Sequence, residues 1–289
     1  MNYMIIPTWD WKTAYETAKE NLSPDTAVLD WTTILVTPEP PPKRGAPVAM
    51  KWSDRHDVTV KWLDQHEGVP VAMNEGWAMA QDLAEIMDDD TAEIYLFLHD
   101  DVTIFEPGWD AVLVSAMRNF GAGIAGFGGA PGLGTRDLYR RPYELNQLAR
   151  VGGFVSNMVE AESHGARAAF PQYVSVLDGF AIAITNEAYN LMGGWARAVK
   201  EGLPIHHMYD AWIACRAAEL GIRTVMVPVN CHHAGGGTSV RRAEEFEALM
   251  KREGYTDGGD VHSKAHEFIY NRFRNVLPLT VENGGRIWG

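Results

Sequence analysis

The chain has 289 residues, of which 46% are hydrophobic and 22% are charged, a composition typical of a globular protein with a sizeable core. Its formal net charge of −13 argues against a protein that binds mainly to the phosphate backbone of nucleic acids, because such binding depends on Lys and Arg. The apolar runs are too short to span a bilayer, and two cysteines, Cys215 and Cys231, do not suggest a disulfide framework. We therefore expect no membrane span and a reducing, cytoplasmic setting.

The first hundred residues alternate between strand and helix patterns. Residues 3–6 predict a short buried strand, residues 11–22 a helix, and residues 32–37 a second strand that prolines stop. Residues 69–73 predict a short strand, followed by a turn at 74–76 and then a helix. A further strand, 95–98, runs into His99-Asp100-Asp101. This alternation favours a mostly parallel α/β sheet flanked by helices, with ligands bound where the carboxyl ends of the strands emerge.

The segment 121–171 is rich in glycine and then in arginine. It lacks the GxxxxGK[ST] pattern of a phosphate-binding loop, so we interpret it as a mobile insertion over a site, on the acceptor side or as a lid. The sequence favours one catalytic domain, 1–240, that contains this insertion. A charged helical extension, 241–289, is expected to pack on it.

The second half of the chain predicts two more strands that carry polar groups. One, within 173–184, is interrupted by Asp178-Gly179, and the other, 224–230, leads into His232-His233. Between them a helix opens near Asp210. Adjacent residues of a strand point to opposite faces, so at most one histidine of the pair is expected in a given site.

Charged groups that end buried strands normally face a cation, each other or solvent, because an unpaired buried charge is costly. His99 and Asp101, Asp178, and His232 or His233 follow or interrupt three predicted strands and would converge on one cleft if those strands are neighbours. A carboxylate with an imidazole suits a divalent ion such as Mn²⁺, while zinc remains possible.

Several short motifs, taken in order, resemble those of the GT-A glycosyltransferases over residues 4–239. The likeness is closest to the inverting family-two type, in the branch that writes its metal motif as HxDV. The motifs are PTW at 7–9, NxG at 74–76, HxDV at 99–102, DGF at 178–180, GGW at 193–195, HxxYD at 206–210 and a strand followed by His and glycines at 224–237.

This resemblance implies a GT-A (Rossmann-like) fold and transfer of a sugar from a nucleotide-diphosphate sugar, with UDP-sugars favoured, to an acceptor hydroxyl with inversion. It implies Mn²⁺ or Mg²⁺ as cofactor. The acceptor could be a glycan, a protein, a small metabolite or a modified DNA base.

The resemblance also implies roles for individual residues. Asp101 would bind the metal, with His99 or Asp100 beside it contacting ribose or a metal-bound water, and His233 or His232 would complete the metal shell. Asp210 would be the general base. Donor-binding residues would be Pro7, Thr8, Asn74, Gly76, Asp100, Asp178 and Gly179, and acceptor-side residues would be Gly194, Trp195 and Tyr209.

Two departures from the family pattern stand beside these matches. The second strand ends in VTPEPP where the family usually has an aspartate that reads the base, and Asp210 is followed by Ala-Trp where many members have a second aspartate. Asp210 could also be a helix cap, and His206 and His207 are interpreted as structural. The alternatives are a metal-dependent hydrolase, a nucleotidyltransferase and a non-catalytic sugar-binding relative.

Overall fold

The computed structural model describes residues 1–38, 49–51, 56–86, 93–134, 153–159, 165–205, 207–235, 242–282 and 286–288. A nine-stranded sheet lies at its centre, in the order β11-β14-β7-β13-β5-β1-β2-β4-β3. Its strands are β1 (Asn2–Pro7), β2 (Trp31–Thr37), β3 (Ala49–Lys51), β4 (His56–Trp62), β5 (Ile94–Leu98), β7 (Ile124–Gly126), β11 (Gln172–Tyr173), β13 (Ala181–Thr185) and β14 (Thr224–Met226). Strands β3, β11 and β13 run against the other six, so the expected mostly parallel sheet is confirmed.

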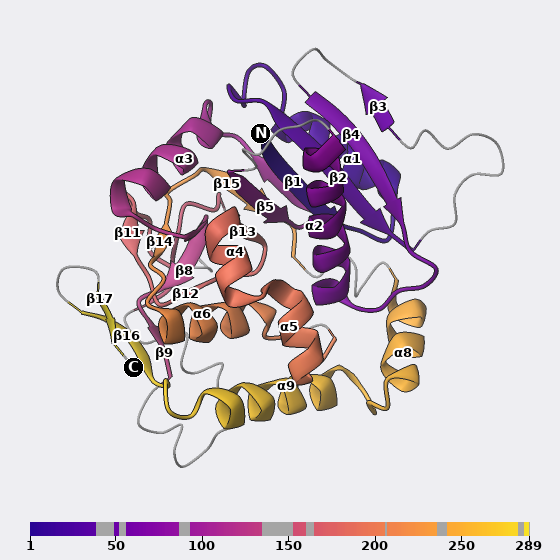
Figure 1. Cartoon of the computed structure of the whole chain (residues 1–289), viewed down its shortest axis with the longest axis vertical. Helices are drawn as coiled ribbons and strands as arrows, with labels where there is room; N and C mark the ends of the chain where they lie inside the picture. Colours follow the sequence, from indigo (N-terminus) through magenta and orange to yellow (C-terminus); the bar gives the residue numbers. More distant parts are fainter. Residues whose placement is uncertain are drawn as a thin grey trace.

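Helices cover both faces of this sheet because the buried strands are apolar on both sides. In β1, Tyr3 and Ile5 pack in one hydrophobic cluster, while Met4 and Ile6 pack in a second. Figure 1 shows the helices around the sheet. The first cluster contains residues of α2 (Val69–Ile86), α4 (Asn186–Met192), α5 (Gly194–Glu201) and α6 (Tyr209–Leu220), and the second those of α1 (Trp11–Asn21) and α3 (Trp109–Phe120).

The strand and turn expected at residues 69–76 are wrong, since these residues form the first two turns of α2. Pro70 suits the first turn of a helix, where its missing N–H is not needed. A Cβ on Gly76 would lie 2.4 Å from Cγ2 of Ile5 and 3.0 Å from Cγ2 of Val36. The glycine therefore allows the helix to approach the sheet closely, and it does not mark a turn.

The described part of the glycine-rich segment forms strands. After β7 come β8 (Gly128–Ala130) and β9 (Gly132–Leu133), and β8 pairs with β10 (Val155–Ser156) and β12 (Val176–Leu177). A Cβ on Gly126 of β7 would lie 2.5 Å from the carbonyl oxygen of Ala181, so the absence of a side chain permits the pairing of β7 with β13. Residues 135–152 and 160–164 of the expected lid lie outside the described residues.

The C-terminal segment packs against the rest of the protein and contains strands as well as helices. It comprises α8 (Ala243–Arg252), α9 (Gly258–Phe273), β16 (Leu279–Glu282) and β17 (Arg286–Trp288). Ile269 and Phe273 of α9 join the core cluster around α6, and β16 pairs with β9 (Figure 1). Among the described helices, none has the length and apolar content required to cross a membrane.

Candidate metal centre and cavity

A small two-stranded sheet brings two predicted site segments together. The chain leaves β5 at Leu98, passes through His99, Asp100 and Asp101, and enters β6 (Val102–Ile104). Strand β6 pairs antiparallel with β15 (Cys231–His233), with His233 opposite Val102. The register therefore sets His233 beside Asp101.

Buried side chains fix the position of this two-stranded sheet. Asn21, at the end of α1, donates from Nδ2 to the carbonyl of Val102 (2.9 Å) and accepts from the N–H of Ile104 at Oδ1 (2.8 Å). Asp100 accepts a 2.6 Å hydrogen bond from the hydroxyl of Thr8, which follows β1. The ends of β1 and β5 are thus tied together.

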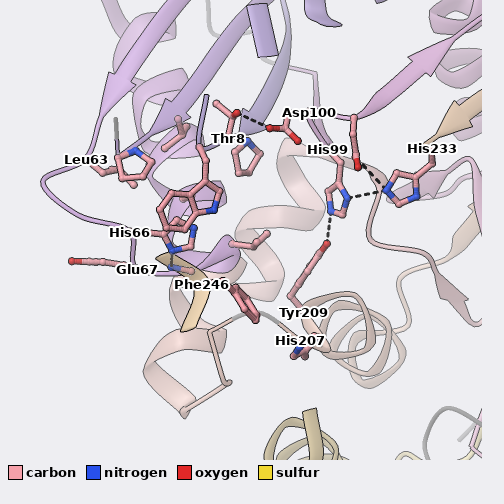
Figure 2. A pocket seen from close by; sticks show the side chains of 18 residues that line it. Thr8, Leu63, His66, Glu67, His99, Asp100, His207, Tyr209, His233 and Phe246 are labelled. Carbon is pink, nitrogen blue, oxygen red and sulfur yellow. Dashed lines mark hydrogen bonds and ion pairs between the residues drawn. The ribbon is translucent and has the colours of Figure 1, made fainter. Parts of the chain in front are cut away.

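His99, Asp101 and His233 bring three possible metal-ligand atoms within 4.8 Å of one another. Nε2 of His233 lies 3.3 Å from Oδ1 of Asp101 and 3.4 Å from Nδ1 of His99. Neighbouring ligands of one divalent ion are about 3.0–3.4 Å apart when its bonds are about 2.1 Å long. We call His99, Asp101, His233 and Tyr209, whose hydroxyl bonds to His99, the polar corner (Figure 2).

The pKa shifts in the polar corner follow from burial and pairing. Burial lowers the pKa of His99 to about 4, so its imidazole is neutral at pH 7 and can bind a metal. Burial alone would raise the pKa of Asp101 and lower that of His233. Their hydrogen bond and mutual charge outweigh burial, so the pKa of Asp101 is lowered and that of His233 is raised.

The donor set suits a transition-metal ion better than Mg²⁺ or Ca²⁺. Two imidazoles and one carboxylate match Mn²⁺, Fe²⁺ or Zn²⁺, whereas the harder ions prefer oxygen ligands. His232, the neighbour of His233 on β15, is not part of this cluster. This agrees with the expectation that only one histidine of the pair enters a given site.

A cavity of about 240 Å³ opens beside the polar corner. Its opposite side carries Leu63, His66 and Phe246 (Figure 2), and Trp9 stacks on His66; we call these four residues the aromatic wall. The rings of Trp9 and His66 stack with their centroids 4.0 Å apart and 9° between planes. The indole N–H of Trp9 is buried and has no hydrogen-bond partner among the described residues.

The described lining of the cavity contains acidic side chains but no Lys or Arg. Glu67, Asp100 and Asp101 all contribute to it. An anionic ligand would therefore meet a negative surface there unless a bound cation intervened.

Asp210 lies in the first turn of α6, next to Tyr209, and is not among the residues that line the cavity. Its Oδ1 accepts a 2.7 Å hydrogen bond from the N–H of Ala211, and the N–H of Gly179 also donates to its carboxyl group. Burial, reinforced by the charge of Asp178, raises the pKa of Asp210 to about 7. At neutral pH, a carboxyl group with a pKa of about 7 is present in both its protonated and its ionised form.

The other predicted site residues fall into two groups. Pro7, Thr8 and Asp100 line the cavity, as does Tyr209. Four others lie in packed helices: Asn74 and Gly76 in α2, and Gly194 and Trp195 at the start of α5, with Trp195 fully buried among Phe97, Tyr189 and Tyr209.

Four residues with aromatic rings in the cavity lining were not expected from the sequence: Trp9, His66, His207 and Phe246. Trp9 follows Pro7-Thr8 directly, so its place at a strand end could have suggested it. His207 was interpreted as structural, while His206 lies outside the described residues. His66 comes from a connecting loop and Phe246 from α8, and neither has a local sequence signal.

Comparison with known proteins finds similarity in fold but not in sequence. No known family profile matches the chain, and no curated protein is similar in sequence. Similar structures include GalNAc-T7 with UDP, GalNAc and Mn²⁺, which is 12% identical over 95% of this chain with a TM-score of 0.51. The mannosyltransferase PcManGT from Pyrobaculum calidifontis with GDP-Man and Mn²⁺ is 16% identical over 92% of this chain with a TM-score of 0.48. S. aureus TarS is 11% identical over 96% of this chain with a TM-score of 0.45. The matches span 54%, 69% and 72% of those three chains, respectively. The likeness to GalNAc-T7 confirms the expected GT-A fold class.

Proposed function

We propose that the protein is a metal-dependent glycosyltransferase that moves a sugar from a nucleotide-diphosphate sugar to an acceptor hydroxyl with inversion. The observation that carries this proposal is the juxtaposition of a metal-ligand triad with a cavity that contains no described Lys or Arg. A diphosphate carries several negative charges, so a bound cation would favour its binding beside Glu67, Asp100 and Asp101.

The aromatic wall suits the nucleobase of such a donor. A flat heteroaromatic ring gains stacking and apolar contact against Trp9, Leu63 and Phe246. A buried N–H without a partner costs free energy, which a base carbonyl would recover by accepting from the indole of Trp9. UDP-sugars remain the favoured donors, since GalNAc-T7, with the same fold, was solved with UDP.

The residues divide the reaction between binding and proton transfer. Asp101, His99 and His233 would hold Mn²⁺, or Mg²⁺ less favourably, and a bound divalent ion neutralises charge that develops on the leaving diphosphate. Thr8 and Asp100 would line the donor side. As the acceptor oxygen bonds to the anomeric carbon, the carboxylate of Asp210 would take its proton. Asp178 and Gly179, which interact with Asp210, would lie beside the sugar.

A triad of two histidines and one carboxylate also occurs in non-haem iron oxygenases and could serve a metal-dependent hydrolase. The GT-A fold favours glycosyl transfer over both. A product assay separates these activities, because transfer gives a glycosylated acceptor, hydrolysis gives free sugar, and oxygenation consumes O₂.

The test is a thermal-shift screen of nucleoside diphosphates with and without Mn²⁺, followed by product analysis with the matching nucleotide sugars. A ligand at 100 times its Kd adds about 2.7 kcal/mol of stability, or a shift of about 5 °C in Tm for a chain of this size. We expect this shift only when Mn²⁺ and nucleotide are both present.

Asp101→Asn should lose the shift, while Asp57→Asn, a matched change of an exposed carboxylate on β4, should keep it. No shift in the wild-type protein with any nucleoside diphosphate would overturn the proposal. So would an equal shift with and without metal.

A further inference from the structure

The hydroxyl of Tyr209 points at the ring of His99 (Figure 2) and also contacts the backbone of Gly179. It is 2.7 Å from Nε2 of His99 and 3.3 Å from the carbonyl oxygen of Gly179. Tyr209 is buried, and its ring packs edge-on against the indole of Trp195. Its position is therefore set by packing as well as by hydrogen bonds.

The direction of these hydrogen bonds determines where His99 carries its proton. A carbonyl oxygen can only accept, so the Tyr209 hydroxyl donates to Gly179. When its one proton is donated to Gly179, the hydroxyl oxygen can accept from Nε2–H of His99, and that direction leaves the lone pair of the neutral ring on Nδ1. That nitrogen faces His233, 3.4 Å from its Nε2.

We propose that Tyr209 is a positioning residue that fixes His99 in the Nε2–H tautomer and so presents the Nδ1 lone pair to the metal site. The inference rests on the proposed function, since it assigns a role within the metal centre. Histidines that bind metals generally donate their other ring N–H to a neighbouring group, and loss of that partner typically weakens metal affinity by about 10–100-fold.

Gly179 supplies the space that this arrangement needs. A Cβ at residue 179 would lie 2.4 Å from the Tyr209 hydroxyl oxygen and 2.7 Å from the ring carbon that bears it. Either the phenol or the backbone would have to move, so Gly179→Ala should disturb the same hydrogen bonds without removing a polar group. The space taken by the Tyr209 phenol thus explains why residue 179, in the DGF motif, is a glycine in this chain.

The test compares Tyr209→Phe with Tyr189→Phe. The control also removes a buried hydroxyl, one that accepts from the N–H of Trp195, and Tyr189 is not among the described residues that line the cavity. Mn²⁺ affinity, measured by calorimetry without nucleotide, should fall about 10–100-fold in Tyr209→Phe and stay within about two-fold in Tyr189→Phe.

A second readout uses the wild-type protein without metal. Long-range ¹H–¹⁵N NMR correlations of the His99 ring should show the proton on Nε2, and Tyr209→Phe should show a mixture of tautomers. A proton on Nδ1 in the wild type would overturn the inference even if the variant failed to fold.

The two hypotheses fail differently. Wild-type Mn²⁺ affinity retained in a folded Tyr209→Phe protein would overturn the role of Tyr209 and leave the glycosyltransferase proposal intact. No Mn²⁺ binding by the wild type would overturn both the metal-dependent function and the positioning role.

Discussion

The two sides of the cavity are built in different ways. In the polar corner, backbone pairing between β6 and β15 sets Asp101 beside His233, and the ring nitrogens of His99 each have a polar neighbour. In the aromatic wall, ring stacking holds Trp9 against His66, and the Trp9 N–H remains without a partner among the described residues. The corner is preorganised for a small ion, whereas the wall offers contact area and one hydrogen-bond donor to a larger ligand.

This difference predicts that substitutions in the corner reduce turnover as well as donor binding, whereas substitutions in the wall reduce donor binding alone. The largest effect should come from Asp101→Asn, which removes the anionic metal ligand. We expect kcat/KM for sugar transfer to fall by about 10⁴-fold or more, because donor binding and charge stabilisation are lost together. Steady-state kinetics with Mn²⁺ checks this, with Asp57→Asn as the control. Activity within ten-fold of wild type would show that the metal site lies elsewhere.

Asp210→Asn should have the next largest effect. It retains shape but cannot accept a proton, so kcat should fall by about 10²–10⁴-fold while donor Kd changes little. Because the pKa of Asp210 is about 7, wild-type kcat/KM should rise with pH through about 7 as the carboxylate ionises. A normal kcat in the variant would mean that Asp210 only stabilises the start of α6.

Trp9→Ala should act on binding alone. Loss of stacking and of the indole N–H should weaken nucleoside diphosphate binding by about 10–100-fold, equivalent to about 1.4–2.7 kcal/mol. Mn²⁺ affinity should be unchanged, since Trp9 is not a member of the triad. Trp11→Ala is the matched control, because Trp11 packs edge-on against Trp62 and is not part of the cavity lining. Equal weakening by both variants would indicate a general loss of packing.

The last effect concerns stability. The pKa of Asp210 in the folded protein is above its value in the unfolded chain, so the folded state binds the proton more tightly. Its contribution to stability is therefore present below about pH 4 and is lost as pH rises to about 7. At pH 8, Asp210→Asn should be more stable than wild type by a few kcal/mol, and the two should converge near pH 4. Urea unfolding at both pH values checks this, and an unchanged difference would contradict the raised pKa.

The polar corner was easier to predict from the sequence than the aromatic wall. His99 and Asp101 directly follow an apolar strand. Because ligand sites in α/β sheets lie at the carboxyl ends of the strands, this position is sufficient to place them at the sheet edge. The choice between His232 and His233 depends on the register of β15 with β6, a non-local pairing that the sequence does not reveal. Phe246 reaches the cavity from α8 through packing between segments far apart in the sequence, which the sequence does not reveal either.

Residues 69–76 show a different limit. Val69, Val71 and Met73 suit a strand locally, and Asn74-Glu75-Gly76 suits a turn. Packing of α2 against β1 and β2 overrides those preferences, and Gly76 is the point of closest approach. Local propensity describes this segment poorly because its conformation is fixed by tertiary contacts.

In the proposed reaction, the polar corner holds the metal that carries the donor's diphosphate. The most direct measurement is a crystal structure with Mn²⁺ and a nucleoside diphosphate, with data collected at the manganese absorption edge. We predict an anomalous peak within bonding distance of Oδ1 of Asp101, Nε2 of His233 and Nδ1 of His99, bridged to the phosphates, with the base against Trp9. A nucleotide bound in the cavity with no anomalous peak at the polar corner would contradict the account.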